Sequence, residues 1–389
     1  RVTNDFIDDP LGTDLEMTHI KTAEELVNKI NAEPYGYYIL DNDIDFSGMT
    51  QNVTQTFMGK LDGNGHKIIG NKIPIFQKIR FGYVKDLVFE RTDIPMNIAN
   101  VGALSVRTEY SVIENVKAKE LQLNFGGRND VSLIGGSVGT TVTSGIEVET
   151  LKNKITSIED FLKLNENPGG IYVLETDLDF TGYTGNGSVI TSTFTGKLDG
   201  NGHTLSNLTN LSLFNSVTGT IENVNIKNFT NIGTATTDDV TAFIKLTNGA
   251  TLRNLKFENI TLEGRHRVAV VSSFDNANSI FENISVKNAN VKGSGVYVST
   301  FIGRKYGGTI KNVLVEGNME ITTTENGGIV GAFQKGGTME NVISKVNIHK
   351  TENTYKPVEN SEFNGGIVGN IYDKPIIKNA IALGDMEGF

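Results

Sequence analysis

A four-residue pattern recurs along the chain at nearly constant intervals, and this periodicity constrains the fold more than any other feature. The pattern is an apolar residue, any residue, an asparagine and a second apolar residue, as in "IENV" at Ile113 and "IKNV" at Ile310. Between residues 254 and 341 successive asparagines are separated by 29 residues. A fixed period of this length is typical of solenoids, in which each repeat packs on its neighbours. The asparagines of the pattern are Asn115, Asn223, Asn254, Asn283, Asn312, Asn341 and Asn379.

Each repeat consists of short segments with alternating apolar residues, separated by Gly, Asn, Thr or Lys. This alternation is typical of β-strands and not of helices. Several short strands in every repeat predict an all-β fold, a right-handed parallel β-helix whose coils stack about 4.8 Å apart. Asparagine tolerates the left-handed backbone of a sharp corner, and stacked asparagine side chains can form a hydrogen-bonded ladder. We therefore interpret the asparagine row as structural, in preference to a row of ligand-binding side chains.

The first part of the repeat array is present twice. The segment "FMGKLDGNGH" at Phe57 returns as "FTGKLDGNGH" at Phe194, with nine of ten residues identical. Each copy follows a helical segment and an acidic strand, so the duplication is larger than the motif. The sequence thus predicts a duplicated β-helix: a leader or linker over 1–15, a first module over 16–150 and a longer second module over 151–389.

Short amphipathic capping helices are predicted at the start of both modules. Ile20, Ala23, Leu26, Val27 and Ile30 recur at helical spacing, and Thr22 with Glu25 fits a capping box. The second module repeats this pattern from Ile155 to Leu162, with Ser157 and Asp160 in the capping positions. Because an open solenoid end exposes unpaired strand edges, we expect at least the first helix to cover such an end.

The duplicated motif contains residue types that could form either a turn or a metal site. Asn-Gly is a strong turn signal because both residues accept positive φ, and a preceding Asp can cap the turn. One histidine per copy offers few metal ligands. We therefore predict structural turns formed by Asp62, Gly63, Asn64, Gly65 and His66, and by Asp199, Gly200, Asn201, Gly202 and His203.

Three alternate aspartates, Asp41, Asp43 and Asp45, are the weak candidates for a calcium site. Their spacing is that of the start of an EF-hand loop, but the glycine and the distal glutamate of such a loop are missing. Strict alternation instead places the three on one face of a strand. We favour a structural or solvated role, and predict no metal site in this chain.

Sites for catalysis or anion binding have little support in the sequence. A polysaccharide hydrolase needs paired carboxylates, and Asp238 with Asp239 is the one pair considered for that role. The tract Arg265, His266 and Arg267 could bind a carboxylate or sulfate, although such a tract is more often a solvated corner. The chain has no His-Glu-x-x-His segment, so we predict no catalytic residue.

Composition excludes several other classes of function. The chain has no cysteine, which rules out disulfides and thiolate metal sites. Its net charge of -10 and pI of about 5.2 disfavour a nucleic-acid partner. No apolar run approaches the roughly 18 residues that a membrane span requires. The opening "RVTNDFIDDPLG" resembles the middle of a longer protein, so we expect this chain to be a fragment.

Several ordered segments together resemble the N-terminal β-helical region of the IgA1-specific zinc metallopeptidase family, which are surface proteases of streptococci and related Gram-positive cocci. These segments are "IKTAEELVNKINAEPYGYYILDNDIDFSG", the Lys-Leu-Asp-Gly-Asn-Gly-His step, "PIFQKIRFGYVKDLVFE", "NVGAL" and "GGIVGNIYDKPIIKNAIALGDMEGF". The resemblance covers the chain from about residue 16 to residue 389.

The resemblance implies a non-catalytic region of a secreted, cell-wall-associated protease, whose zinc and catalytic residues lie C-terminal to it. This region would act as a spacer and as a surface that engages a protein substrate, with immunoglobulin as one candidate. The remaining partner would be the rest of the protease, and we expect a monomer without cofactor. The alternatives are a stand-alone surface adhesin or carbohydrate-binding β-helix and, with less support, a polysaccharide hydrolase or lyase.

Overall fold

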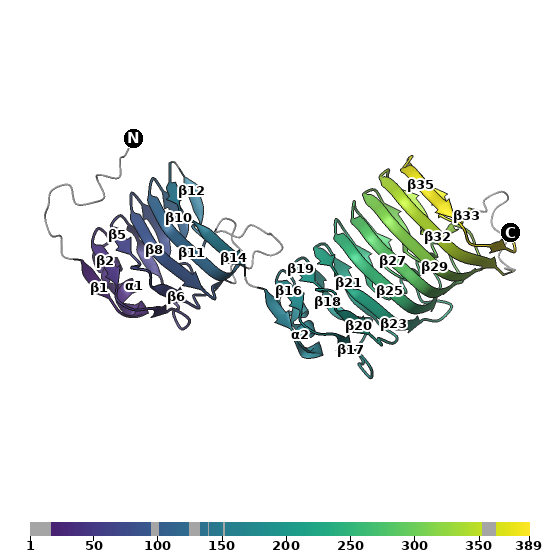
Figure 1. Ribbon diagram of the computed structural model, residues 1–389, viewed down its shortest axis with the longest axis horizontal. Helices are drawn as coiled ribbons and strands as arrows, with labels where there is room; N and C mark the ends of the chain where they lie inside the picture. Colours follow the sequence, from purple (N-terminus) through teal and green to yellow (C-terminus); the bar gives the residue numbers. More distant parts are fainter. Residues whose placement is uncertain (1–16, 95–100, 124–132, 139, 151, 352–362) are drawn as a thin grey trace. The chain divides into compact units, whose positions relative to one another are not determined.

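The chain folds into parallel β-sheets with two short α-helices in the part that the structure describes (Figure 1). This computed structural model describes residues 17–94, 101–123, 133–138, 140–150, 152–351 and 363–389, so the predicted linker over 1–15 lies outside it. The chain divides into two compact units, unit 1 (Arg1–Lys152) and unit 2 (Asn153–Phe389). The all-β prediction is confirmed, and strands pair in parallel throughout both units, as in β25 with β27.

Unit 1 contains a ten-stranded and a four-stranded sheet. The ten-stranded sheet has the order β1-β2-β5-β8-β11-β13, with β3, β6, β9 and β14 paired at its side. Its strands are β1 (Thr18–Ile20), β2 (Tyr37–Leu40), β3 (Ile44–Asp45), β5 (Lys60–Asp62), β6 (Lys67–Ile69), β8 (Tyr83–Glu90), β9 (Asp93–Ile94), β11 (Val112–Leu123), β13 (Val142–Ser144) and β14 (Glu147–Thr150). The four-stranded sheet contains β4 (Val53–Phe57), β7 (Phe76–Arg80), β10 (Ser105–Glu109) and β12 (Gly136–Val138).

Unit 2 has the same plan with more repeats. Its thirteen-stranded sheet contains β15 (Asn153–Ile155), β16 (Ile171–Leu174), β17 (Leu178–Asp179), β19 (Lys197–Asp199), β20 (Thr204–Ser206), β22 (Thr220–Glu222), β23 (Asn225–Ile232), β25 (Thr251–Gly264), β27 (Ile280–Gly293), β29 (Thr309–Ile321), β32 (Thr338–Lys350), β35 (Ile376–Ala382) and β36 (Met386–Glu387). Its seven-stranded sheet contains β18 (Ser188–Phe194), β21 (Ser212–Val217), β24 (Ile244–Thr247), β26 (Ser272–Asp275), β28 (Ile302–Tyr306), β31 (Val330–Gln334) and β34 (Val368–Ile371). Strands β30 (Asn326–Gly327) and β33 (Asn364–Gly365) pair with each other.

The chain passes alternately between the two large sheets of unit 2. Strands β24, β26 and β28 lie in one sheet, whereas β25, β27 and β29 lie in the other. Each repeat returns to the register of the one before, so that Leu252, Phe281, Ile310 and Met339 are successive partners. All four side chains are buried. The repeat length read from the sequence is therefore the distance along the chain between hydrogen-bonded strands.

Each unit has its own continuous hydrophobic core. In unit 1 the rings of Phe57 and Phe76 stack with centroids 4.9 Å apart. In unit 2 Phe194, Phe214 and Phe243 follow one another with centroids 5.8 and 5.7 Å apart. Phe57 and Phe194 open the two copies of the duplicated motif, so its first residue packs in the core in both units.

The predicted helices are present but start later than the apolar spacing indicates. Helix α1 (Ala23–Ala32) buries Ala23, Leu26, Val27 and Ile30, whereas Ile20 belongs to β1. Helix α2 (Ile158–Leu162) continues as a 3-10 helix, η2 (Lys163–Asn165). The caps fix these starts, because the Thr22 hydroxyl accepts the Glu25 N–H at 3.2 Å and the Ser157 hydroxyl accepts the Asp160 N–H at 3.1 Å.

An asparagine side chain from the last turn of each helical segment accepts hydrogen bonds from backbone N–H groups at the edge of the smaller sheet. The side-chain oxygen of Asn31 accepts the N–H groups of Thr54 and Gln55 in the edge strand β4, at 3.0 and 3.1 Å. In unit 2 Asn165 accepts the N–H groups of the corresponding edge strand β18. Unpaired edge groups promote association with other strands, so one side chain per unit protects this edge.

Candidate functional site

The asparagines predicted from the repeat pattern form hydrogen-bonded ladders. In unit 2 each side-chain amide donates to the side-chain oxygen of the preceding repeat, at 2.8–3.2 Å from Asn254 to Asn379. The ladder starts on an aspartate, because Asn223 donates to Asp199 at 3.0 Å. All the asparagines of the pattern, Asn115 of unit 1 included, have φ between 49° and 58°. The corner backbone is thus left-handed at each of them, where asparagine is tolerated.

The structure contains two further ladders that the sequence reasoning missed. The second runs through Asn207, Asn228, Asn259 and Asn288, and it also starts on an aspartate, Asp179. The asparagines of the second ladder stand in the same apolar-x-Asn-apolar pattern. In "NVNIKNF" and "NLKFENI" the second asparagine corner comes five residues after that of the first ladder, so the sequence does contain a signal for it. The third ladder joins Asn290, Asn318 and Asn347, which lie in β27, β29 and β32 and, unlike the asparagines of the first two ladders, do not have positive φ.

The duplicated motif forms a turn that fits directly against the next repeat. The Asp62 carboxylate accepts the Asn64 N–H at 2.8 Å, and Asp199 accepts the Asn201 N–H at 2.9 Å. A Cβ atom on Gly63 would collide with the backbone carbonyl oxygen of Asp86, the residue in the asparagine position of the next repeat. Gly200 lies against the Asn223 carbonyl in the same way. Both copies therefore need glycine because the next corner approaches so closely.

The histidine of the motif contacts the acidic segment that precedes it. His66 Nδ1 lies 3.2 Å from Asp43 Oδ1, and His203 Nδ1 lies 3.0 Å from Asp177 Oδ1. The backbone N–H of Thr204 and the His203 ring hold the pKa of Asp177 below its usual value. The histidine thus links the turn to the preceding repeat in both units.

The three calcium candidates do not lie on one strand face, because β2 ends before Asp41 and Asp45 alone of the three lies in β3. Each carboxylate has its own partner: Asp41 is 2.7 Å from His19 Nδ1, Asp43 contacts His66, and Asp45 accepts the Ser47 N–H at 2.9 Å. In the part of the chain that the structure describes, no group of three or more His, Asp or Glu side chains could hold a metal ion.

The basic tract and the acidic pair lie on consecutive repeats and neutralise each other. Arg265 donates two hydrogen bonds to Asp238, at 2.8 and 2.9 Å, and Arg267 donates two to Asp239, at 2.6 and 2.9 Å. His266 Nδ1 accepts the Val296 N–H at 2.9 Å, and burial lowers the pKa of this histidine. Side chains held in bidentate pairs are occupied, so neither the carboxylates nor the guanidinium groups are set up for a ligand.

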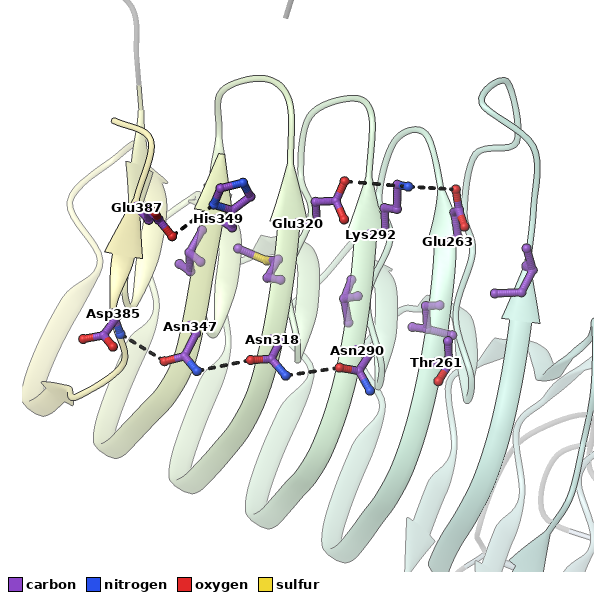
Figure 2. A pocket seen from close by; sticks show the side chains of 15 residues that line it. Thr261, Glu263, Asn290, Lys292, Asn318, Glu320, Asn347, His349, Asp385 and Glu387 are labelled. Atoms are coloured by element: carbon purple, nitrogen blue, oxygen red, sulfur yellow. Dashed lines mark hydrogen bonds and ion pairs between the residues drawn. The ribbon is translucent and has the colours of Figure 1, made fainter. Parts of the chain in front are cut away.

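A groove of about 420 Å³ runs across β25, β27, β29, β32 and β36 of unit 2. Figure 2 shows the third ladder along one side of it, from Asn290 through Asn318 and Asn347 to the backbone N–H of Asp385. The strand residues between its two sides are Leu262, Val291, Met319 and Ile348, whose side chains are buried in the core.

Charged side chains form the opposite side of the groove. Lys292 lies between Glu263 and Glu320, 3.7 Å from each, and His349 lies 3.4 Å from Glu387 (Figure 2). All five side chains are about half exposed or more. Exposed pairs of this kind are weak and exchange readily with other partners. This side of the groove therefore offers exchangeable charges to a ligand.

A second groove, of about 530 Å³, follows the first ladder along Asn254, Asn283, Asn312 and Asn341. In a ladder each asparagine uses one amide hydrogen and one oxygen lone pair, which leaves a second of each. Both grooves therefore present rows of amide donors and acceptors that recur once per sequence repeat. Such rows suit an extended polar ligand that lies across the strands.

No helix in the described part of the chain has the length and apolar content that a bilayer crossing requires. Residues 15–119 match the family model described as the M26 IgA1-specific metallo-endopeptidase N-terminal region. Among solved structures the chain is similar to a candidate immunoglobulin A1 protease from Bacteroides ovatus, with 18% identity and a TM-score of 0.43. That match covers 58% of this chain and 74% of the other. No curated protein matches significantly.

Proposed function

Because residues 15–119 carry the sequence of the N-terminal region of the M26 IgA1-specific metallo-endopeptidases, we propose that this chain is a non-catalytic region of a cell-surface zinc metallopeptidase. The family match is the observation that carries this proposal. The duplicated architecture extends it to unit 2, because unit 2 repeats the helix cap, the acidic segment and the turn of the matched region. Zinc and the catalytic residues belong to a domain elsewhere in the parent protein.

The form of the region is a right-handed parallel β-helix in each unit. Parallel pairing at a constant repeat length, alternation between two sheets and continuous asparagine ladders support this reading. A solenoid is stiff and presents a long flank, which suits a spacer that also engages a large substrate. The protein substrate, with IgA1 as the candidate, would lie along such a flank. The region is extracellular, cell-wall associated and monomeric in this proposal.

Polysaccharide cleavage has less support, because of how its candidate carboxylates are held. The acidic pair weighed for polysaccharide cleavage, Asp238 and Asp239, is held by two arginines, whereas hydrolysis requires one free acid and one free base or nucleophile.

Removal of this region from the parent protease tests the role. We expect KM for intact IgA1 to rise severalfold, while kcat and KM for a short peptide that spans the cleavage site stay unchanged, because only the large substrate reaches the flank. Equal losses on both substrates would show that the region serves only the folding of its neighbour. As a complementary control, the separate chain added in excess should inhibit cleavage of IgA1 and leave peptide cleavage unaffected.

A stand-alone carbohydrate-binding or adhesive β-helix is the second candidate, and the amide-lined groove of Figure 2 favours it. Rows of amides and carboxylates suit a hydroxyl-rich polymer. The gene separates the two candidates: a His-Glu-x-x-His segment encoded downstream supports the protease, and a stop codon supports the adhesin. Glycan-array binding that is lost in Asn318→Ala would assign the groove to the second candidate.

A further inference from the structure

Two exposed aromatic residues of unit 1 have a backbone conformation that aromatic residues rarely adopt. Phe81 has φ of 55° and Tyr110 has φ of 47°. The left-handed region is unfavourable for a residue with a Cβ atom, and bulky residues are genuine outliers there. Both residues lie within the stretch that matches the family model. Strain of this kind concentrates at functional sites, so these two positions call for a functional explanation.

The same corner occurs in unit 2, which shows what the fold itself requires. In unit 1 the Ser111 hydroxyl accepts the Gly82 N–H at 3.2 Å. In unit 2 the Ser279 hydroxyl accepts the Ala250 N–H at 3.0 Å. The following backbone bonds also correspond, from Val112 N–H to the Gly82 carbonyl and from Ile280 N–H to the Ala250 carbonyl. The two corners therefore have the same hydrogen-bond framework.

The residues just before Gly82 and Ser111 differ from those just before Ala250 and Ser279, their counterparts in unit 2. Phe81 corresponds to Gly249, with φ of 69°, and Tyr110 corresponds to Asn278, with φ of 43°. Glycine and asparagine are the residue types that adopt this conformation at low cost. The corner thus needs positive φ but does not need an aromatic side chain, and unit 1 carries the strain for another reason.

Burial does not explain the two rings. The relative exposure of Phe81 is 60% and that of Tyr110 is 48%. The rings stack with centroids 5.4 Å apart, and the Arg80 guanidinium lies 5.1 Å from the centre of the Phe81 ring. Exposed contacts of this kind are weak and comparable in size to the strain, so the arrangement adds little net stability.

The aromatic pair lies in a basic environment on an acidic protein. Lys78, Arg80 and Arg107 surround a single carboxylate, Glu109, at 3.0, 3.6 and 2.6 Å. The hydrogen bond from Lys78 and the nearby arginines hold the pKa of Glu109 below its usual value. Among the described side chains, three cations against one anion leave a local positive charge on a chain whose net charge is -10.

We propose that this aromatic corner, formed by Lys78, Arg80, Phe81, Arg107 and Tyr110, is a contact site for the protein part of IgA1. The inference rests on the proposed function and names the surface that engages the substrate. Aromatic residues and arginine dominate the energetically important centres of protein interfaces. The complementary surface would be an apolar pocket with acidic residues at its rim. A glycan fits less well, because it stacks on a free ring face, whereas Arg80 and Tyr110 lie over Phe81.

The test exchanges the aromatic residues for those that unit 2 uses. The double variant Phe81→Gly with Tyr110→Asn keeps the corner conformation and removes both rings. We expect its Kd for IgA1, measured by surface plasmon resonance on the full chain, to rise by about tenfold or more. We expect its Tm to stay the same or rise, since the strain is relieved. Tyr35→Asn is the matched control, because Tyr35 is 65% exposed in the same unit and has no positive φ.

The outcomes separate the inference from the proposed function. Loss of binding with an unchanged or higher Tm supports the aromatic corner as a contact site. Unchanged binding in the double variant, or a clear fall in its Tm, overturns the inference while leaving the proposed function in place. Binding that disappears when IgA1 is deglycosylated also overturns it, in favour of a glycan. If the unaltered chain does not bind IgA1, the substrate-engaging role fails and the inference fails with it.

Discussion

Lys305 and Asp275 form an ion pair in which neither side chain is exposed, with 2.7 Å between Nζ and Oδ2. They lie on neighbouring strands, β28 and β26, of the seven-stranded sheet. Lys305 also donates to the Ser279 carbonyl, and the Thr247 hydroxyl donates to the second carboxylate oxygen of Asp275, both at 3.1 Å. Burial lowers the pKa of Lys305. A charge that is so completely removed from water depends on its partner.

Removal of one partner should therefore be far more damaging than removal of both. We expect Lys305→Met to lower the free energy of unfolding of unit 2 by about 3–5 kcal/mol, because Asp275 would remain charged and unpaired. The double variant Lys305→Met with Asp275→Leu should recover most of that loss. Urea denaturation of the three proteins measures the difference. A double variant no more stable than the single one would show that the pair contributes specific hydrogen bonds that apolar packing cannot replace.

The asparagine ladder allows backbone strain and hydrogen bonding to be measured separately. Asn312 donates to Asn283, accepts from Asn341 and has φ of 55°. We expect Asn312→Gly to cost about 1–2 kcal/mol for the lost side-chain bonds. Asn312→Ala should cost roughly 1–2 kcal/mol more, because alanine is strained at positive φ and glycine is not.

Asn379 provides the matched control, because in the described part of the chain its side chain makes a single ladder bond, to Asn341. Asn379→Gly should cost less than Asn312→Gly in the same denaturation experiment. Equal costs at the two positions would contradict the view that each ladder bond contributes separately to stability.

The repeat pattern predicted the strands and the all-β class because strand period and repeat length are both properties of the local sequence. Partners on adjacent repeats were harder to predict. In the sequence Arg265 and Asp238 belong to separate candidate sites 27 residues apart, whereas in the structure they are paired. Repeats of unequal length do not reveal which corner residues face each other, since a one-residue shift in register changes every pair.

The same limit applies to Phe81 and Tyr110. Sequence alone gives no sign that an aromatic residue occupies a left-handed corner, because the hydrogen bonds that define the corner come from the neighbouring repeat. The duplicated turn could be predicted from the sequence, since Asn-Gly encodes positive φ locally. The contact of its histidine, His66, could not be predicted, because the Asp43 that it contacts lies 23 residues earlier in the chain.

Asn31 and Asn165, which hydrogen-bond the edge strands, should allow the stability of each unit to be lowered separately. Asn31→Ala should expose the N–H groups of Thr54 and Gln55 in β4, and Asn165→Ala those of Thr191 and Ser192 in unit 2. Each should cost about 1–3 kcal/mol in its own unit. Hydrogen exchange followed by mass spectrometry should show faster exchange in the edge strand of the altered unit only. Faster exchange in both units after either substitution would show that the units do not unfold independently.

His266 should make the stability of unit 2 depend on pH in the mildly acidic range. Burial lowers its pKa, the neighbouring Arg265 and Arg267 add to this, and together they outweigh the opposite effect of Asp238. In the folded state the ring therefore stays neutral to a lower pH than in the unfolded state, where its pKa is about 6.5. Its Nδ1 also accepts the Val296 N–H, which a protonated ring cannot do.

The direction in which the free energy of unfolding changes with pH follows from proton linkage. Below about pH 6.5 the unfolded chain binds a proton at this histidine that the folded chain does not, so the free energy of unfolding falls as pH decreases toward the folded pKa. Above that pH the contribution is complete and constant. We expect His266→Gln to flatten this part of the stability profile between about pH 7 and pH 5, measured by urea denaturation at each pH. His349→Gln serves as the control, because His349 is exposed beside Glu387. A profile that keeps its slope in His266→Gln and loses it in His349→Gln would assign the titration to the groove instead.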